Sequence, residues 1–218
     1  MIRTEDGWRR FCSERGTSGD QVFDILKDWS EESARLTQEI SGLMLRPLNL
    51  DDLEQIYKWR NDPEIMARTR QWRMLEWNEH LRWFNNLDHD RDIMRAITVK
   101  ALSLESNMVG VCGLTHIDWV NRSAEVSIYI GDENFRRKGV AKEAIRQLKV
   151  MAFDQMNLHR LWAEIYSFNS PGLGLFKSCG FGYEDILLDT VYRNGKYYNS
   201  HFYNFLEDAW KNEKSDTG

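Results

Sequence analysis

The pattern of hydrophobic and polar positions from residue 43 onward predicts strands and helices that alternate along the chain. Residues 124–130 alternate β-branched or aromatic residues with polar or small ones, which favours a strand. From Lys142 onward, apolar residues recur at spacings of three and four, which favours a helix with one buried face. The apolar positions of this helix are Ala144, Ile145, Leu148, Met151 and Ala152.

Further segments have the apolar and β-branched content of strands. One of them follows the predicted helix directly, so we expect it to lie parallel to 124–130. Asn194-Gly195 separates the last two segments and is a strong hairpin signal, and Glu105-Ser106-Asn107 suits a second hairpin turn. The pattern predicts a mixed α/β fold with a central sheet of about seven strands. The further segments are 43–48, 94–102, 108–117, 160–165, 185–191 and 197–206.

Helices are predicted between these strands. Asn49 or Asp51 is placed to cap a helix that contains the apolar positions immediately after it. Pro63 bars the continuation of that helix, because proline lacks the N–H that the next turn needs. A second helix is predicted over about 76–87, and a short one over 172–179.

The same pattern divides the chain into three parts. Residues 1–42 carry helix-like patterning that Gly42 ends, and we expect an N-terminal helical extension. This arm is expected to pack on the main domain or on a second subunit, which would make a homodimer. Residues 43–208 form the main domain, and residues 209–218 are expected to be a frayed tail.

Composition narrows the class of protein. The chain has 218 residues, 42% hydrophobic and 29% charged, which is ordinary for one globular domain with an appendage. A net charge of -5 argues against general nucleic-acid affinity, and there is neither an apolar run of about eighteen residues nor a signal-peptide pattern. We therefore expect no nucleic-acid or membrane partner. Cys12, Cys112 and Cys179 lack metal-ligand spacing, which predicts no metal site and a reduced, cytoplasmic setting.

The turn between the strand 124–130 and the following helix has the chemistry of a phosphate site. It reads Arg136-Arg137-Lys138-Gly139-Val140-Ala141. Gly139 lets a ligand approach the backbone, and Ala141 adds little bulk. The helix that starts here offers free N–H groups and the positive end of its dipole, and the basic side chains add charge.

This turn matches the R/Q-x-x-G-x-G/A motif with which GNAT-superfamily acyltransferases cradle the pyrophosphate of acetyl-CoA. About thirty residues downstream, 169–181 resembles the second signature of the family, an Asn followed by a short helix ending in Gly-Phe. The resemblance covers Leu43 to Leu206. It implies a GNAT fold with a splayed parallel strand pair, N-acetyltransferase activity, acetyl-CoA as the acyl donor and a small amine as the acceptor.

The resemblance also implies a binding site for acetyl-CoA. The pantetheine arm would lie between the splayed strands, and a backbone N–H of Ile128 or Ile130 would stabilise the oxyanion. Asn169 would contact the arm, with a turn-capping role as the alternative. Many relatives place a tyrosine where this chain has Phe176, so the usual proton donor to the thiolate is in doubt. The cofactor-binding residues expected are Ile128, Ile130, Arg136, Arg137, Lys138, Gly139, Val140, Ala141, Asn169 and Phe176.

An acceptor amine must lose a proton before it attacks, so the site needs a base. Glu125 is the first candidate because it lies on the strand that lines the cleft, and an ion-paired structural glutamate is the equal alternative. His116 follows, with Asp118 and His80 behind it. Tyr129 could donate a proton if its hydroxyl points into the cleft.

The acceptor is open between several classes of amine. The segments 59–65 and 79–84 resemble enzymes that acetylate the 4-amino group of UDP-linked sugars in the pseudaminic acid pathway, and 121–125 and 157–160 resemble spermidine and ribosomal-protein N-terminal acetyltransferases. Arginines and tryptophans outnumber acids near residues 60–83, which favours a nucleotide-linked amino sugar over a polyamine, unless the arginines are only solvated helix faces. A non-catalytic acyl-CoA-binding module is the remaining alternative. The acceptor contacts expected are Arg60, Asn61, His80 and Trp83.

Overall fold

The computed structural model describes residues 42–100 and 106–215. The chain divides into two units at the junction of Gly42 and Leu43, and the second unit contains the sheet. The helical extension predicted for residues 1–42 lies, apart from Gly42, outside the described residues and stays a prediction.

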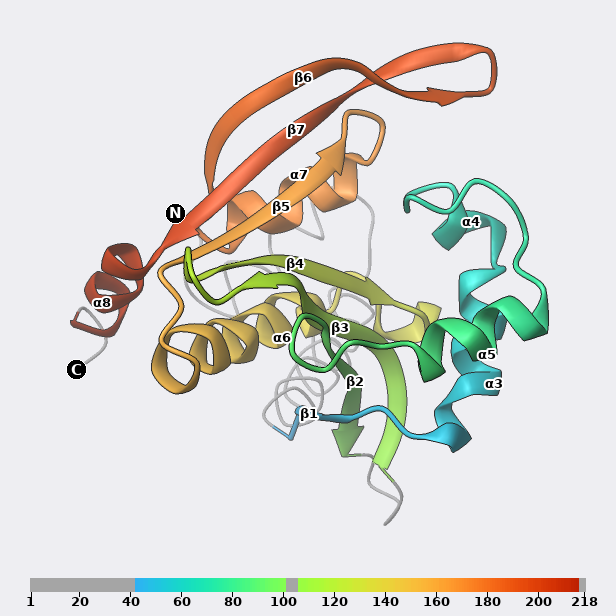
Figure 1. Cartoon of the computed structure of the whole chain (residues 1–218), viewed down its shortest axis with the longest axis horizontal. Coiled ribbons are helices and arrows are strands. Elements are labelled where there is room, and N and C mark those ends of the chain that lie inside the picture. Colours follow the sequence, from blue (N-terminus) through green and yellow to red (C-terminus); the bar gives the residue numbers. More distant parts are fainter. Residues whose placement is uncertain (1–41, 101–105, 216–218) are drawn as a thin grey trace, which may run out of the picture. The chain divides into compact units, whose positions relative to one another are not determined.

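Seven strands in the described part of the chain form one sheet in the order β1-β2-β3-β4-β5-β7-β6 (Figure 1). Neighbours are antiparallel except β4 and β5, which run parallel as expected from the helical crossover between them. The predicted mixed α/β sheet is therefore confirmed. The strands are β1 (Met44–Pro47), β2 (Ile93–Lys100), β3 (Ser106–Asp118), β4 (Ser123–Ile130), β5 (Arg160–Tyr166), β6 (Gly182–Arg193) and β7 (Lys196–Leu206).

Two predicted turns have different outcomes. Asn194 and Gly195 have φ angles of 50° and 78° between β6 and β7, so the hairpin prediction is confirmed. The turn predicted over 105–107 is wrong for its last two residues, because Ser106 and Asn107 already pair with β2. A polar Ser-Asn pair is compatible with an exposed strand end as well as with a turn, and composition alone does not separate the two.

The described helices cover the sheet and connect its strands. Asn49, one of two candidate caps, accepts a hydrogen bond from the Asp52 N–H at 3.2 Å, and Asp52 returns the contact in a capping box. The first helix ends at Arg60 and does not continue through Pro63, as expected, and Pro63 then opens a further short helix behind the cap Asp62. The helices are η1 (Leu50–Asp52), α3 (Leu53–Arg60), α4 (Pro63–Met66), α5 (Trp77–Asn85), η2 (Glu133–Phe135), α6 (Val140–Lys149), η3 (Val150–Gln155), α7 (Ser170–Ser178) and α8 (Glu207–Ser215).

The apolar face of α6 is buried as its spacing predicts. Ala144, Ile145 and Leu148 are fully buried, as is Ala152 in the π-helical continuation η3. The helix packs against β1, β3 and β4. Because burying a side chain such as Ile or Leu contributes about 1.5–3 kcal/mol, this face fixes the start of α6 relative to β4.

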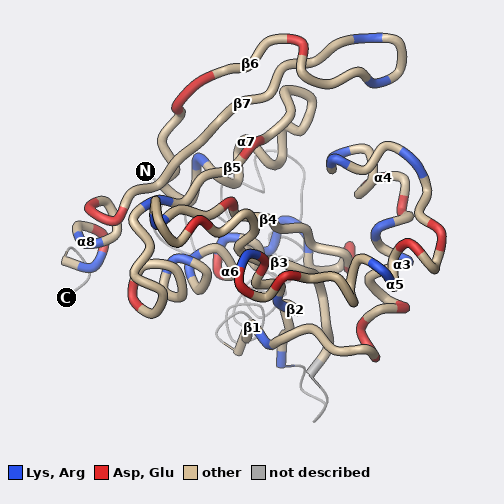
Figure 2. Tube along the Cα trace, in the orientation of Figure 1, with Lys and Arg blue, Asp and Glu red and all other residues tan. Residues whose placement is uncertain are grey.

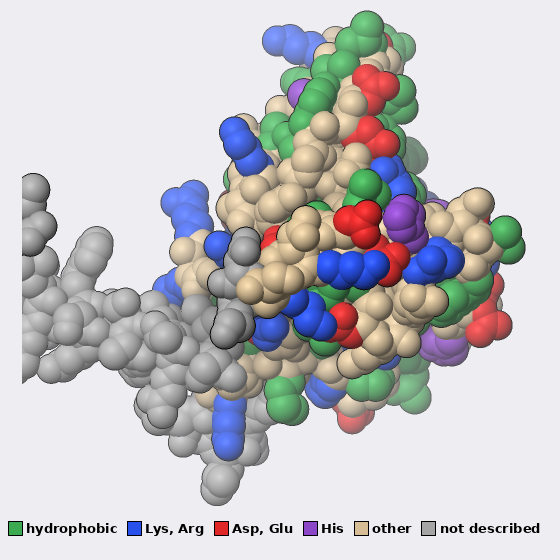
Figure 3. Space-filling model, turned by 90° about the vertical axis from the view of Figure 1, so that its left-hand side faces the viewer, with side chains coloured by type: hydrophobic (Ala, Val, Ile, Leu, Met, Phe, Trp, Pro, Cys, Tyr) green, Lys and Arg blue, Asp and Glu red, His purple; other side chains and the backbone are tan. Residues whose placement is uncertain are grey.

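The β6–β7 hairpin carries apolar side chains on its surface. Leu188, Tyr192 and Tyr197 are 72%, 60% and 63% exposed. Hydrophobic side chains gather along the upper part of the view in Figure 3, where this hairpin lies. At its tip, Arg193 donates to the carbonyl of Arg70 at 3.1 Å, so the hairpin holds the segment that joins α4 to α5.

The frayed tail predicted for residues 209–218 is wrong over most of its length, because Glu207–Ser215 forms α8. Trp210 is buried, and its indole Nε1 donates to Asp154 Oδ1 at 2.9 Å. Its ring stacks on Phe153 with centroids 6.2 Å apart. The sequence around Trp210 is too polar to show helical periodicity, so only the tertiary contact reveals the helix.

We predict that Trp210→Ala lowers the free energy of unfolding by about 3 kcal/mol or more, because it removes a buried aromatic ring and leaves a cavity. Urea denaturation measures the change. Asp208→Ala, at an exposed position of the same helix, is the control and should change stability by less than about 0.5 kcal/mol. Equal effects of the two substitutions would contradict the docking of α8.

Candidate active site

The site is organised by a split in the sheet. β4 and β5 pair from Ser123–Arg160 to Glu125–Trp162, and the described ladder goes no further. A cleft of about 450 Å³ opens where they part. Its lining includes residues of α3, α4, α5, the segment between α4 and α5, β2, β3, β4, β5 and α7. The split leaves one edge of β4 available to an extended ligand.

The register of β3 and β4 shows which backbone groups face this split. The Gly131 N–H donates to the Val109 carbonyl at 2.9 Å, so Gly131 faces β3. Because direction alternates along a strand, Ser127 and Tyr129 also face β3, while Val126, Ile128 and Ile130 point toward β5. The carbonyl of Ile130 accepts from Arg136 Nε at 3.1 Å. Both oxyanion candidates, Ile128 and Ile130, therefore direct their N–H groups into the gap.

The turn before α6 presents unpaired N–H groups. Gly139 occupies the N-cap position with φ 84°, a left-handed conformation that favours glycine, and it has no side chain to cap the helix. The first intrahelical bond runs from the Glu143 N–H to the Gly139 carbonyl at 3.0 Å. The N–H groups of residues 140–142 therefore lack intrahelical partners. Together with the positive end of the helix dipole they make a site for an anion.

The basic side chains of this turn differ in their surroundings. Arg136 donates to the carbonyls of Ile130 and Gly131 and forms an ion pair with Glu64 at 2.5 Å, so it braces the turn. Arg137 is exposed and has φ 61°, and Lys138 is half-buried. Arg136, one of the three predicted phosphate contacts, thus braces the turn in this conformation. The groups of this turn that are available to donate to an anion are backbone N–H groups.

At the other wall of the cleft, Asn169 caps α7. Its Oδ1 accepts from the Gly172 N–H at 3.1 Å, and its Nδ2 donates to the Arg68 carbonyl at 3.3 Å. The capping alternative is thus what the geometry shows, although Asn169 also lines the cleft. Phe176 lines it too and packs edge-on against Phe181, with ring centroids 5.0 Å apart.

Glu125 is buried and fully engaged. Arg70 donates to its two oxygens at 2.6 and 3.0 Å, and it donates to Glu164 at 2.7 Å. Burial lowers the pKa of Arg70, but the hydrogen bonds to Glu125 and Glu164 outweigh burial and raise the pKa above its ordinary value. The ion-paired alternative for Glu125 describes this arrangement, and its role as the base remains a prediction.

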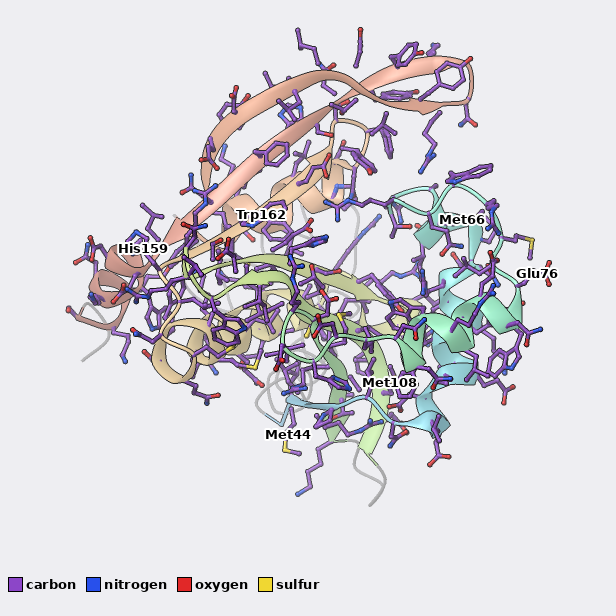
Figure 4. All side chains as sticks on the ribbon, viewed as in Figure 1. Met44, Met66, Glu76, Met108, His159 and Trp162 are labelled. Atoms are coloured by element: carbon purple, nitrogen blue, oxygen red, sulfur yellow. The ribbon has the colours of Figure 1, made fainter. Side chains whose placement is uncertain are left out.

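A bulge brings His116 to the same carboxylate. The register of β3 and β4 shifts between Thr115 and Asp118, and His116 has φ 53°. Its Nδ1 lies 3.0 Å from Glu125 Oε2, and its side chain is 62% exposed at the cleft. Trp162, which Figure 4 labels on β5, places its ring centroid 6.3 Å from the imidazole. Two of the predicted catalytic residues are thus in direct contact.

The third, Tyr129, lies beside two predicted acceptor contacts. Arg60, Trp83 and Tyr129 all line the cleft, and Arg60 Cζ lies 4.9 Å from the centroid of Trp83. Among the described residues, neither Arg60 Nη1 nor the Tyr129 hydroxyl has a hydrogen-bond partner, and both atoms are buried. Burial lowers the pKa of Arg60 and raises the pKa of Tyr129.

The other predicted contacts lie away from the cleft lining. His80 is fully buried, and its Nε2 lies 3.0 Å from the Leu53 carbonyl, so it joins α5 to α3. Asn61 accepts from the Leu75 N–H at 2.7 Å and clamps the α4–α5 segment. Asp118 accepts from the Asn121 N–H at 2.8 Å in the turn between β3 and β4. The predictions for His80 and Asn61 required knowing which face of α5, and of the segment after α3, turns toward the cleft. Helical spacing alone does not show this.

Sequence reasoning missed Glu164, which shares Arg70 with Glu125. A signal was present, because polar positions alternate with buried ones along β5 and place Glu164 on the side of the sheet where Glu125 lies. The pairing itself depends on Arg70, which is distant in sequence.

Two further searches concern the described residues alone. No three of their His, Cys, Asp or Glu side chains converge in a way that could hold a metal ion. None of their helices is both long enough and apolar enough to cross a membrane.

These features define a class of protein. A model of the GNAT acetyltransferase domain matches residues 42–182, and the chain belongs to this family. It is therefore an acetyl-CoA-dependent N-acetyltransferase, and the resemblance seen in its sequence is confirmed.

Individual relatives differ in their names. Spermidine N(1)-acetyltransferase from Vibrio cholerae is 29% identical over 157 residues, which cover 72% of this chain and 88% of that protein. Acetyltransferase PseH from Campylobacter jejuni is 27% identical over 148 residues, which cover 66% of this chain and 86% of that protein. A crystal structure of spermidine N-acetyltransferase from Vibrio cholerae with CoA and spermine superposes with a TM-score of 0.70 at 25% identity. The match covers 78% of this chain and 99% of that one.

Proposed function

We propose that the amine of the acceptor attacks the thioester of acetyl-CoA directly, within the split between β4 and β5. The pantetheine arm would pair with the free edge of β4, where Val126, Ile128 and Ile130 point toward the gap. The diphosphate would bind the N–H groups of residues 140–142. This placement sets the thioester beside an incoming nitrogen, and such positioning supplies much of the rate.

The tetrahedral intermediate carries a negative oxygen that needs a donor. We take the N–H of Ile128 as the donor, because Ile130 is the last residue of β4 whereas Ile128 lies within the strand. A fixed backbone donor in a partly dry cleft is worth more than one in water, since it needs no reorganisation as charge develops.

The proton of the acceptor ammonium would go to His116. Its Nδ1 lies against Glu125, which leaves Nε2 as the acceptor atom, and Glu125 would stabilise the imidazolium that forms. Arg70 fixes Glu125 in position. Phe176 has no proton to give, so the thiolate, with an ordinary pKa of about 8.5, leaves as the anion or takes the proton held by His116.

The acceptor we propose is a primary amine on a nucleotide-linked sugar. One observation supports this: Arg70 bridges Glu125 and Glu164, so these carboxylates of the cleft already have a cationic partner. A polyamine, with several positive charges, is best held by carboxylates that lack one. Arginine positions also follow the chain around α4 (Figure 2), and two of these arginines, Arg68 and Arg70, line the cleft.

A polyamine is the second candidate, because spermidine N-acetyltransferase from Vibrio cholerae is similar to this chain in both sequence and structure. For a polyamine to bind, one of its ammonium groups would have to displace Arg70 from Glu125 or Glu164. A protein N-terminal amine is the third candidate, and the resemblance of the sequence segments supports it.

An acceptor panel tests the choice. Release of free CoA thiol is measured with a UDP-linked 4-amino sugar, spermidine and a peptide with a free N-terminus. We expect kcat/KM for the UDP-amino sugar to exceed the other two at least tenfold. If spermidine is preferred in the wild type, the nucleotide-sugar proposal is wrong and the polyamine candidate replaces it.

Substitutions at the base test the proton path. His116→Gln should lower kcat about 10²- to 10⁴-fold with little change in the KM of acetyl-CoA. Glu125→Gln should lower kcat less, since Nε2 of His116 remains. A larger loss in Glu125→Gln than in His116→Gln would assign the base to Glu125 instead.

A further inference from the structure

Three side chains, from two helices and one strand, lie together at the acceptor side of the cleft. Arg60 comes from α3, Trp83 from α5 and Tyr129 from β4. Trp83 supports Arg60 from one side, with Cζ 4.9 Å from the ring centroid, and His80 stacks on Trp83 at 5.4 Å. Trp59 packs edge-on against Tyr129 with centroids 6.5 Å apart. The guanidinium and the phenol ring are therefore each supported by one aromatic ring.

Within the described part of the chain, the cluster holds two buried hydrogen-bond donors that have no acceptor. Arg60 Nη1 and the Tyr129 hydroxyl are buried and unpaired. A buried donor without an acceptor costs about 1–3 kcal/mol, and more when the group is charged. Burial keeps the proton on Tyr129, since it raises the pKa of the phenol. Arginine can only donate, so what would satisfy both groups is an acceptor oxygen.

The acidic side chains that line the cleft are engaged elsewhere. Glu125 and Glu164 bind Arg70, and Asp92 accepts from the His116 N–H at 3.2 Å. Arg68, a further cation of the lining, pairs with Glu64 at 2.8 Å. Arg60 thus differs from the other arginines of the cleft in having no carboxylate of the described chain against it.

We propose that Arg60 and Tyr129 form a subsite for one anionic oxygen of the acceptor, a phosphoryl or carboxylate oxygen, which enters between them from the cleft. The subsite rests on the proposed acetyl transfer in that it names the chemistry of the acceptor for that reaction. It is distinct from the diphosphate site, which is made of backbone N–H groups before α6. It also gives Tyr129 a binding role in place of the proton-donor role expected from the sequence.

Anion binding to the CoA-saturated protein tests the subsite without turnover. Saturating CoA fills the diphosphate site, and the melting temperature is then followed while inorganic phosphate or acetate replaces chloride at constant ionic strength. We expect phosphate or acetate to stabilise the wild type. Arg60→Gln should lower the affinity for that anion about 10- to 100-fold. Tyr129→Phe, which removes only the hydroxyl, should weaken it about 3- to 10-fold.

Lys58→Gln is the matched control, because Lys58 lies exposed on the same helix and outside the cleft lining. It should bind the anion as the wild type does. A response to phosphate identifies a phosphoryl-bearing acceptor, and a response to acetate identifies a carboxylate-bearing one. The proposal is overturned if neither anion exceeds chloride in the wild type, or if Arg60→Gln and Tyr129→Phe both retain wild-type affinity.

Turnover separates this proposal from the proposed function. Glucosamine 6-phosphate is compared with glucosamine, and glutamate with glutamine. In the wild type one anionic member should have the higher kcat/KM; Arg60→Gln should bring the ratio of the anionic to the neutral member close to one, whereas Lys58→Gln should keep the wild-type ratio. Acetylation of both members at equal rates would overturn the subsite and leave acetyl transfer standing. Anion binding without acetylation of any amine in the acceptor panel would leave the subsite standing and overturn the proposed acceptor chemistry.

Discussion

The parting of two parallel strands is the constraint on which the rest of this structure depends. β4 and β5 share hydrogen bonds only up to Glu125–Trp162, and beyond that point the backbone of β4 has no strand partner on one side. Unpaired backbone groups inside a protein are costly, so such a split persists only where a ligand or solvent completes it. The buried stripe of α6 and the hydrogen bonds of Arg136 to Ile130 and Gly131 hold the end of β4 and the turn before α6 together.

Arg70 closes the other end of the split. It reaches Glu125 on β4 and Glu164 on β5 at the level where the strands separate. Glu164 in turn accepts from the Ser200 hydroxyl on β7 at 2.6 Å. The carbonyl of Arg70 is held by Arg193 from the β6–β7 hairpin. Segments far apart in sequence therefore meet around Arg70, and its guanidinium orients the carboxylate that contacts His116.

The sequence was informative where periodicity and local chemistry act. The strand, basic turn and helix around Gly139 follow from alternation, a left-handed glycine and a 3.6-residue stripe, and the two motifs identified the family. Side-chain partners were less accessible: His80 and Asn61 face the interior rather than the cleft, and Trp210 docks a helix that its polar neighbours conceal. These depend on contacts between distant segments, which a pattern along one segment does not contain.

Residue-resolved amide hydrogen exchange with and without CoA examines the split most directly. We expect CoA to slow exchange at the N–H groups of Ile128 and of residues 140–142, and to leave Ser127 and Tyr129 unchanged, because those two already face β3. Such alternation would arise only if the ligand lies along the open edge of β4. Equal protection of Ser127, Ile128 and Tyr129, or no change at any of them, would contradict it.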